Sequence, residues 1–214
     1  MDILGPILII AILIYSSVIH EIAHGYTAYR LGDPTAKLMG RLTLNPLKHI
    51  DWYMSILLPL ILYISTGFVF GGAKPVPVDP FNLRDGRKDL ALVSLVGPLS
   101  NFALAIIASL FIHLLYPHAS FFEVKQHDIG GFILTGIVTV NLLLGIFNLV
   151  PIPPLDGSKV FSLILPHKTA EAYMSLGNIG MIFLMILLFF PLGGFSLMGF
   201  VASIISFTLS LLGF

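Results

Sequence analysis

Three residues near the N-terminus, His20, Glu21 and His24, have types and spacing that could bind a metal and act on a substrate. In a helix, positions 20 and 24 lie about 40° apart around the axis and about 6 Å apart along it. Two imidazoles on one face at that spacing can share a zinc ion, with Glu21 in reach of a water molecule on the metal. The preceding segment, 3–19, contains no charged residue. Because a charge at membrane depth is costly, Glu21 indicates a function, although two structural histidines beside an interfacial glutamate remain the alternative.

The composition indicates an integral membrane protein. Of the 214 residues, 57% are hydrophobic and only 10% are charged, whereas a soluble domain has about 25% charged residues. Residues 1–19 contain no Lys or Arg, so they lack the basic region of a secretory signal and are expected to remain as a transmembrane helix. Four further uncharged stretches are long enough to span a membrane: 52–73, 90–116, 131–155 and 172–214.

The charge balance and the absence of cysteine exclude several classes of function. The chain has 11 basic and 11 acidic residues, so nothing indicates a nucleic-acid partner. It has no cysteine, which excludes disulfides and thiolate ligands. Any bound metal must therefore be held by His, Asp or Glu side chains.

The pattern predicts an all-α polytopic membrane protein that forms one domain over residues 1–214. We expect about five transmembrane helices, with a catalytic core at about 1–165 and a C-terminal helical hairpin at about 172–214. Residues 35–51 mix leucines with polar residues and predict a short β-hairpin at the membrane surface. In 71–78, two prolines alternate with valines, which prevents a helix and predicts a strand-like segment.

A zinc ion held by two histidines needs a third protein ligand and an open position for water. Asp156 is a candidate because it ends the apolar run 131–155 and follows three prolines that restrict the backbone. The alternative is that Asp156 caps a short helix over 158–165.

Four sequence motifs together resemble the small site-2 proteases, which are zinc intramembrane metalloproteases of bacteria and archaea. The resemblance covers about residues 15–165, in a form without a PDZ-like insertion or a CBS-like tail. Each motif alone is of low or moderate specificity, but their common order makes the resemblance specific. The motifs are HEIAHGYTAYRLGDPTAKLMGRLTLNP, GGAKPVPVDP, GPLSN and FNLVPIPPLDG.

The resemblance implies a role for each candidate residue. Asp156 would complete a site for one Zn²⁺ per chain with His20 and His24, and Glu21 would be the general base. Asn148 would bind the substrate backbone or the developing oxyanion, unless it makes a helix–helix hydrogen bond. The segment 71–78 would pair with an extended substrate strand, and because Pro75 and Pro77 lack N–H groups, the pairing would depend on Ala73, Lys74, Val76 and Val78.

The resemblance also implies a partner: a transmembrane substrate protein, such as a single-pass protein of the anti-sigma-factor type, in a prokaryotic cell membrane. Zinc ligands must share one depth, so the helix that carries His20 and the run that ends at Asp156 must leave the membrane on the same side. Segment 52–70 is then expected to be re-entrant rather than spanning. Ten of the eleven Lys and Arg residues then lie on the side of the active site, which predicts that it opens toward the cytoplasm.

Two other functions are compatible with the same residues. In a metal transporter or channel, His20, Glu21, His24 and Asp156 would form a transit site, but transporters tend to have several such sites, often in repeated halves. In a catalytically inactive scaffold, an intact set of these four residues would be unexpected. The sequence contains one cluster and no internal repeat, which favours the protease.

Overall fold

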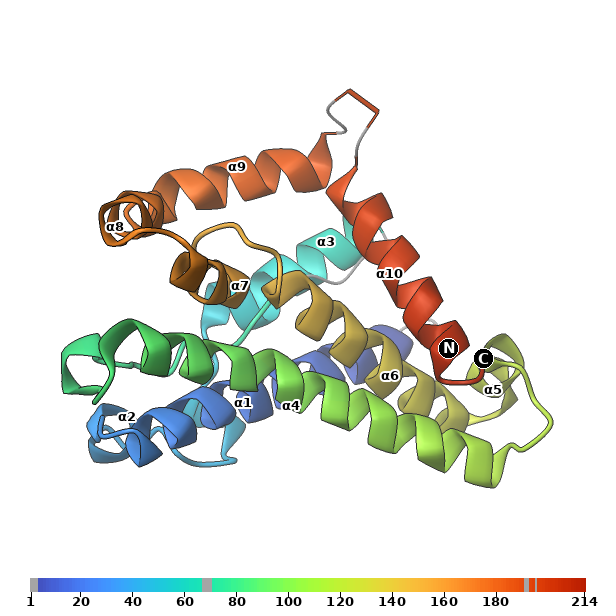
Figure 1. The fold of residues 1–214 in the computed structure, drawn as a ribbon. Helices are drawn as coiled ribbons and strands as arrows, with labels where there is room; N and C mark the ends of the chain where they lie inside the picture. Colours follow the sequence, from blue (N-terminus) through green and yellow to red (C-terminus); the bar gives the residue numbers. More distant parts are fainter. Residues whose placement is uncertain (1–3, 67–70, 191–192, 195) are drawn as a thin grey trace.

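Three long helices form the centre of the molecule: α1 (Leu4–Arg30), α4 (Gly86–Leu115) and α6 (Ile129–Asn148). The computed structural model describes residues 4–66, 71–190, 193–194 and 196–214. Within them, α4 packs along both α1 and α6 (Figure 1). Each of the three helices is long and apolar enough to cross a membrane.

The predicted number of five transmembrane helices is too high for the described residues. A fourth span is possible only if the bent pair His167–Met174 and Ile179–Leu188, which turns by 66°, counts as one. The predicted C-terminal segment contains α9 (Gly177–Phe189) and α10 (Leu197–Leu211), but part of the turn between them lies outside the described residues. α10 has 15 residues, so it rises only about 22 Å and does not reach across the roughly 30 Å hydrocarbon core of a bilayer.

Buried aliphatic side chains hold the C-terminal helices against the central bundle. Ile112 of α4 and Leu142 of α6 are almost fully buried in this core, and Leu184 of α9 and Val201 of α10 complete it. Lipid tails are as apolar as these side chains, so within a bilayer such a core stabilises the fold by close packing rather than by removal from water. The core therefore lies beside α4 and α6, on the side that α9 and α10 cover.

The predicted β-hairpin at 35–51 is wrong, because this segment contains α2 (Thr35–Leu38) and a 3₁₀ turn at Pro46–Lys48. α1 ends as expected before Gly32, whose φ of 116° favours glycine. The next residue, Asp33, is fully buried and accepts hydrogen bonds from the backbone N–H groups of Thr35 and Asp79. Burial alone would raise the pKa of Asp33, but hydrogen bonds, led by that of the Thr35 hydroxyl, hold it below its usual value. Hydrogen bonds to the Asp33 side chain, rather than strand pairing, thus hold the start of this segment in place.

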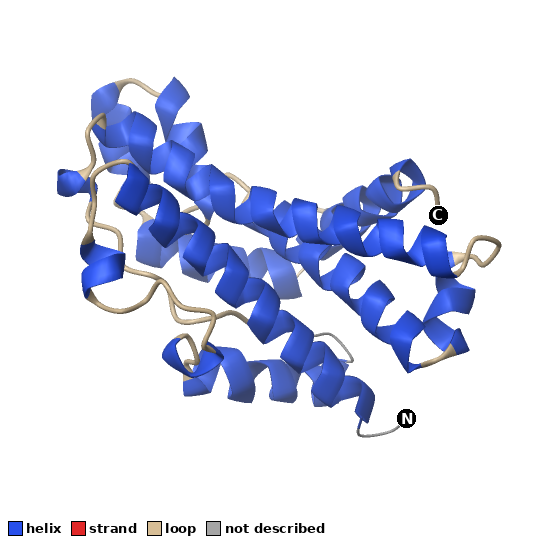
Figure 2. Ribbon diagram, turned by 90° about the horizontal axis from the view of Figure 1, so that it is seen from below, coloured by secondary structure: helices blue, strands red, loops and turns tan. Residues whose placement is uncertain are grey.

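The segment 71–79 is not a strand either, and no strand occurs among the described residues (Figure 2). It lies beside the start of a short helix, in which a π-helical turn, Trp52–Leu57, continues into α3 (Leu58–Thr66). The N–H of Gly72 donates to Met54 O at 3.1 Å, and the N–H of Lys74 donates to His49 O at 2.7 Å. These acceptors lie on turns and not on a strand, so the segment lacks a β partner. The chain on the N-terminal side, at His49 and Met54, therefore lies beside the chain on the C-terminal side, at Gly72 and Lys74.

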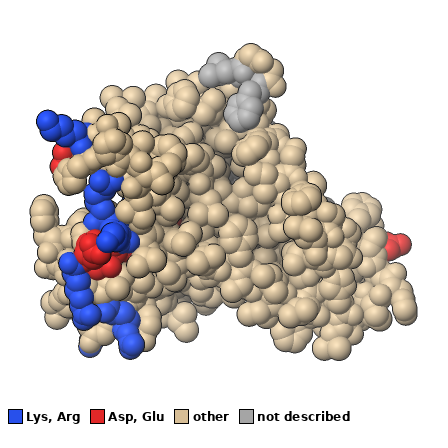
Figure 3. Space-filling view, viewed as in Figure 1, with Lys and Arg blue, Asp and Glu red and all other residues tan. Residues whose placement is uncertain are grey.

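The remaining helices are short and lie at the two ends of the central bundle. Figure 3 shows Lys and Arg side chains gathered at the end of the molecule where α2 and the start of α4 lie. Lys125 belongs to α5, at the opposite end. The bounds of these short helices are α5 (Phe121–His127), α7 (Asp156–Phe161) and α8 (His167–Met174).

Candidate metal centre

The side chains of His20, His24 and Asp156 converge on one buried point. Nε2 of His20 and Nε2 of His24 are 2.9 Å apart, and each lies 3.1 Å from Oδ2 of Asp156. The three residues are only 6–8% exposed. Among the described residues, they form the only group of three or more His, Cys, Asp and Glu that could hold a metal ion.

Two elements position these ligands, as the sequence predicts. His20 and His24 lie one turn apart on α1, and their rings are 4.5 Å apart between centroids. Asp156 is the first residue of α7, after the proline-rich turn that follows α6. The alternative role of Asp156 as a helix cap is not observed, since Leu155 is the N-cap and no side-chain cap bond forms there. Lys159 binds Oδ1 of Asp156 at 3.0 Å, which leaves Oδ2 facing the histidines.

The second nitrogen of each imidazole is held by an oxygen atom of α4. Nδ1 of His24 donates to the backbone carbonyl of Val93 at 2.6 Å, and Nδ1 of His20 donates to Oδ1 of Asn101 at 2.6 Å. A neutral imidazole has one N–H, so both Nε2 atoms then carry lone pairs directed at the shared point. Such outer bonds are usual for histidines that bind metals.

This set of donor atoms fits a zinc ion. Two Nε2 lone pairs and a carboxylate oxygen are all acceptors, and they repel one another at about 3 Å unless a cation lies between them. In tetrahedral zinc sites with bonds of about 2.0–2.1 Å, the ligand atoms lie about 3.3 Å apart. The separations found here are close to that value.

Gly97 of α4 makes the space that the two imidazoles occupy. A Cβ atom at this position would lie 2.3 Å from Cε1 of His24 and 2.7 Å from Nε2 of His20. Val93, Gly97 and Asn101 are four residues apart in turn, so they share one face of α4. The two histidines therefore pack on this face of α4. Val93 and Asn101 accept their hydrogen bonds, and Gly97, between these two residues, leaves the space that the imidazoles fill.

Glu21 lies beside the three ligands and is bonded to the extended segment. Its Oε2 accepts a hydrogen bond from the backbone N–H of Val76 at 2.6 Å. Within the described part of the chain, Val76 is the only hydrogen-bond partner of Glu21. A hydrogen bond to an ionised acceptor is stronger than a neutral one, so this contact fixes one oxygen of the carboxylate.

Polar residues also hold the segment that carries Val76. Arg41 is buried and donates to the carbonyl oxygens of Lys74 and Pro75 at 2.8 and 3.3 Å. His49 is fully buried and accepts from the N–H of Lys74 through its own carbonyl. Burial lowers the pKa of His49, which keeps the ring neutral beside Arg41. Of the four residues predicted to pair with a substrate, Lys74 and Val76 thus already use their N–H groups in this conformation.

Two cavities meet at the candidate centre. One, of about 530 Å³, is lined by His20, His24, Asp156 and Lys159, and the extended segment contributes Pro75, Val76 and Val78. The other, of about 330 Å³, is mainly apolar, and its lining includes Ala73 and Met181. Both are lined by Glu21 and Asn148.

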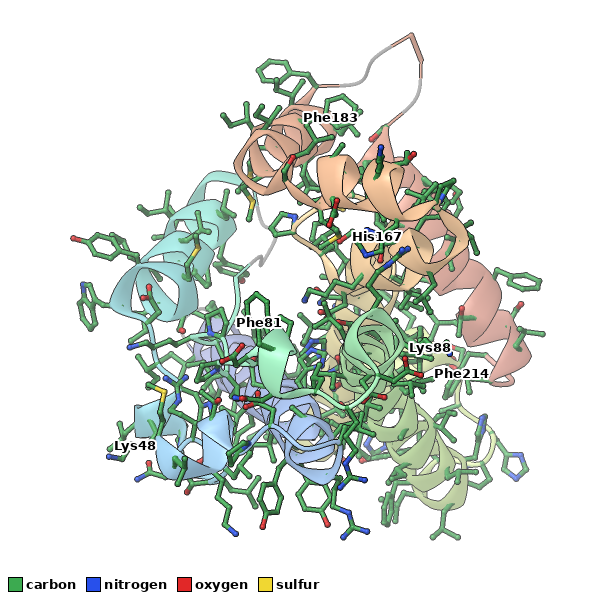
Figure 4. The ribbon with its side chains drawn as sticks, turned by 60° about the vertical axis from the view of Figure 1, so that its left-hand side comes forward. Lys48, Phe81, Lys88, His167, Phe183 and Phe214 are labelled. Carbon is green, nitrogen blue, oxygen red and sulfur yellow. The ribbon has the colours of Figure 1, made fainter. Side chains whose placement is uncertain are left out.

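Asn148 therefore lies where a substrate could reach it, although its Nδ2 donates to Leu144 O at 3.0 Å within its own helix. At the mouth of the larger cavity, the turn Pro80–Asn82 carries Phe81, which is 97% exposed (Figure 4). The apolar side chain of Phe81 is thus exposed to solvent beside the opening.

Sequence reasoning brought together His20, Glu21, His24 and Asp156 but missed the residues that support them. Asn101 is the last residue of the GPLSN motif, and its spacing of four residues from Gly97 indicates a shared helix face. Lys159 follows Asp156 by three residues, the spacing of neighbours on a helix. Arg41 gave no such signal, because it contacts the segment only in the folded chain.

Comparisons with known proteins agree with this geometry. Residues 8–130 and 125–191 match the sequence profile of "Peptidase family M50". The chain is 38% identical over 196 residues to "Putative zinc metalloprotease YwhC" of Bacillus subtilis, which covers 91% of this chain and 85% of that protein. It is 32% identical over 188 residues to "Putative zinc metalloprotease Rip2" of Mycolicibacterium smegmatis, with 86% and 68% covered. No solved structure gives a significant match.

Proposed function

The chain belongs to peptidase family M50 and is a membrane zinc metalloprotease, and from this premise we propose that it hydrolyses peptide bonds in or near the transmembrane segments of other membrane proteins. The observation that carries the proposal is the position of the buried triad His20, His24 and Asp156. Two of the three ligands lie on a helix that is apolar enough to cross a membrane.

The residues of this chain would divide the chemistry between them. His20, His24 and Asp156 would hold one zinc ion per chain, which would supply Lewis-acid chemistry for activating a water molecule and polarising a carbonyl group. Glu21 would accept a proton from that water and pass it to the leaving amide nitrogen. The N–H of Val76, bonded to one carboxylate oxygen, would leave the other free for this transfer. Asn148, on the wall shared by both cavities, would donate to the oxyanion.

The extended segment 71–78 would hold an unwound substrate. A transmembrane helix hides its amides in internal hydrogen bonds, so it must unwind and find new partners before cleavage. The N–H groups of Lys74 and Val76 are engaged, and the carbonyl groups of Gly72, Lys74 and Pro75 accept hydrogen bonds from side chains. First contact would therefore depend on the N–H groups of Ala73 and Val78 and on the remaining carbonyl groups of the segment. The apolar cavity beside Ala73 would take the part of the substrate that is still in the bilayer.

We further propose that the residues between 52 and 70 form a re-entrant segment and that the site opens to the cytoplasm of a prokaryotic cell. The bonds from Gly72 to Met54 and from Lys74 to His49 support the first point, since both flanks of the segment lie together. The apolar helix Trp52–Ile64 is also shorter than a span. The gathering of Lys and Arg at the end near α2 supports the second point (Figure 3).

The test is cleavage by the purified chain, in proteoliposomes, of single-pass membrane proteins carrying an epitope on each side of the transmembrane helix. Glu21→Gln should retain zinc but cleave about 10²–10⁴-fold more slowly. The double variant His20→Ala/His24→Ala should lose both zinc, by elemental analysis, and cleavage. Stoichiometric zinc in the double variant would refute the metal site.

A transport function predicts a different result. Zinc uptake into the same proteoliposomes, without cleavage by the parental chain, would favour a transit site over a catalytic one. Absence of both activities, with zinc bound, would favour a scaffold that binds membrane partners such as single-pass proteins. Cleavage that requires Glu21 would refute both alternatives.

A further inference from the structure

A chain of buried polar side chains leads from the metal centre into the helix bundle. Beyond the bond from His20 to Asn101, Nδ2 of Asn101 donates to Oδ1 of Asn141 at 2.8 Å. Nδ2 of Asn141 donates in turn to Oγ of Ser16 at 2.9 Å. Asn101 and Asn141 are 0% exposed. The chain thus joins α1, α4 and α6 and ends on a nitrogen atom of His20.

The direction of every bond in this chain is set at its far end. Nδ2 of Asn141 also donates to the backbone carbonyl of Ile137 at 2.9 Å, and a carbonyl can only accept. The amide of Asn141 must therefore turn its oxygen toward Asn101. Asn101 must then offer its NH₂ group to Asn141 and its oxygen to His20. As a result, the proton of His20 belongs on Nδ1 and the lone pair on Nε2, where a metal would bind.

We propose that Asn101 and Asn141 are positioning residues for the metal ligand His20. Asn101 fixes the tautomer and the ring plane of His20, and Asn141 fixes the orientation of Asn101. Neither residue reaches the substrate, so both act through His20. This inference rests on the proposed zinc site, but it does not depend on which substrate is cleaved.

A purely structural role would have different consequences. If the two asparagines only joined helices within the bundle, their loss would destabilise the fold without a selective effect on metal binding. Loss of the Oδ1 acceptor of Asn101 would then affect zinc affinity no more than loss of its Nδ2 donor. The two roles are therefore separated by measuring zinc affinity, and by replacing Asn101 in two ways.

The experiment measures zinc affinity of the purified full-length chain in detergent, by competition with a chromogenic chelator and without any substrate. Asn101→Leu removes the acceptor for His20 and should weaken zinc binding by about 10–100-fold. Asn101→Asp also loses the donor to Asn141 but keeps an acceptor for His20, so it should retain at least the parental affinity. Equal losses in the two variants would overturn the proposal.

Asn141→Leu gives a second measurement that does not alter Asn101. It should weaken zinc binding less than Asn101→Leu, and it should add nothing in the Asn101→Leu background, because its effect passes through Asn101. A full additional loss in the double variant would overturn the proposal.

The matched control is Thr135→Val, which removes a different buried polar group of α6, a hydroxyl whose bonds stay within that helix. It should leave zinc affinity unchanged. A loss as large as that of Asn141→Leu would assign the effect to packing of α6 and overturn the proposal. A parental chain that binds no zinc would instead refute the proposed function itself.

Discussion

Replacing Gly97 with alanine should disable the metal centre without unfolding the protein. The new Cβ would lie 2.3 Å from Cε1 and 2.4 Å from Nε2 of His24. The shortest ordinary contact of a Cβ atom is about 3.4 Å, so the imidazole would have to move by about 1 Å. Alanine is also the better helix former, by about 0.5–1 kcal/mol relative to glycine. Any loss therefore cannot come from reduced helix propensity in α4.

The expected effect follows because metal sites tolerate only small changes in metal–ligand distance. Metal–ligand distances hold to about ±0.2 Å, so a displacement of about 1 Å removes His24 from the set or forces the second ligand to move as well. A misplacement of this size can reduce a rate about 10²-fold. We therefore expect Gly97→Ala to contain less zinc and to cleave at least about 10²-fold more slowly.

The assay combines elemental analysis of the purified variant with the rate of cleavage of a single-pass membrane substrate. The control is Gly177→Ala at the start of α9, where an added Cβ would have no neighbour within 4 Å. This control should keep both zinc and activity. Gly97→Ala protein with one zinc per chain and the parental rate would refute the account of how α4 seats the two imidazoles.

Three further predictions concern catalysis, topology and pH. Asn148→Ala should keep zinc and lower kcat about 10²–10³-fold with little change in KM; an unchanged kcat would leave Asn148 only its bond to Leu144. Single cysteines at Thr43 and Asp85 should both react with an impermeant reagent from the cytoplasmic side only, and labelling from opposite sides would show a full crossing of 52–70. A backbone N–H in the first turn of α6 lowers the pKa of Asp128 from 3.8 to about 2. Its stabilisation is complete above 3.8 and is lost as the pH falls through about 2, so Tm should fall less in Asp128→Asn than in the parental chain between about pH 5 and pH 2. Equal decreases would refute this assignment.

The sequence predicted the parts of the site that depend on local spacing. The helical separation of positions 20 and 24 follows from the geometry of one helix, and α1 extends from Leu4 to Arg30 as expected. Asp156 could not be assigned in this way, because its distance from His20 depends on how α6 and α7 pack. Its position made it only a candidate, the family resemblance favoured the ligand role over a helix cap, and in the structure its carboxylate lies against the histidines.

The β elements were predicted wrongly for a physical reason that the sequence does not reveal. Alternating prolines and valines do force an extended backbone over 71–78, but a strand also needs a partner with matching donors and acceptors. Here the partners are Met54, His49 and the Glu21 carboxylate, none of which is on a strand. Contacts of this kind join residues far apart in the chain, so local patterns cannot predict them.

The contrast between the two cavities bears on how cleaved fragments would leave. Hydrolysis turns a neutral amide into an ammonium and a carboxylate, each at a new chain end. Neither charge is stable beside Met181 and Leu184 in the apolar cavity, because burial removes its hydration. The larger cavity contains Lys159, whose side chain is partly exposed to water. The side of the larger cavity is therefore the expected exit for both new chain ends.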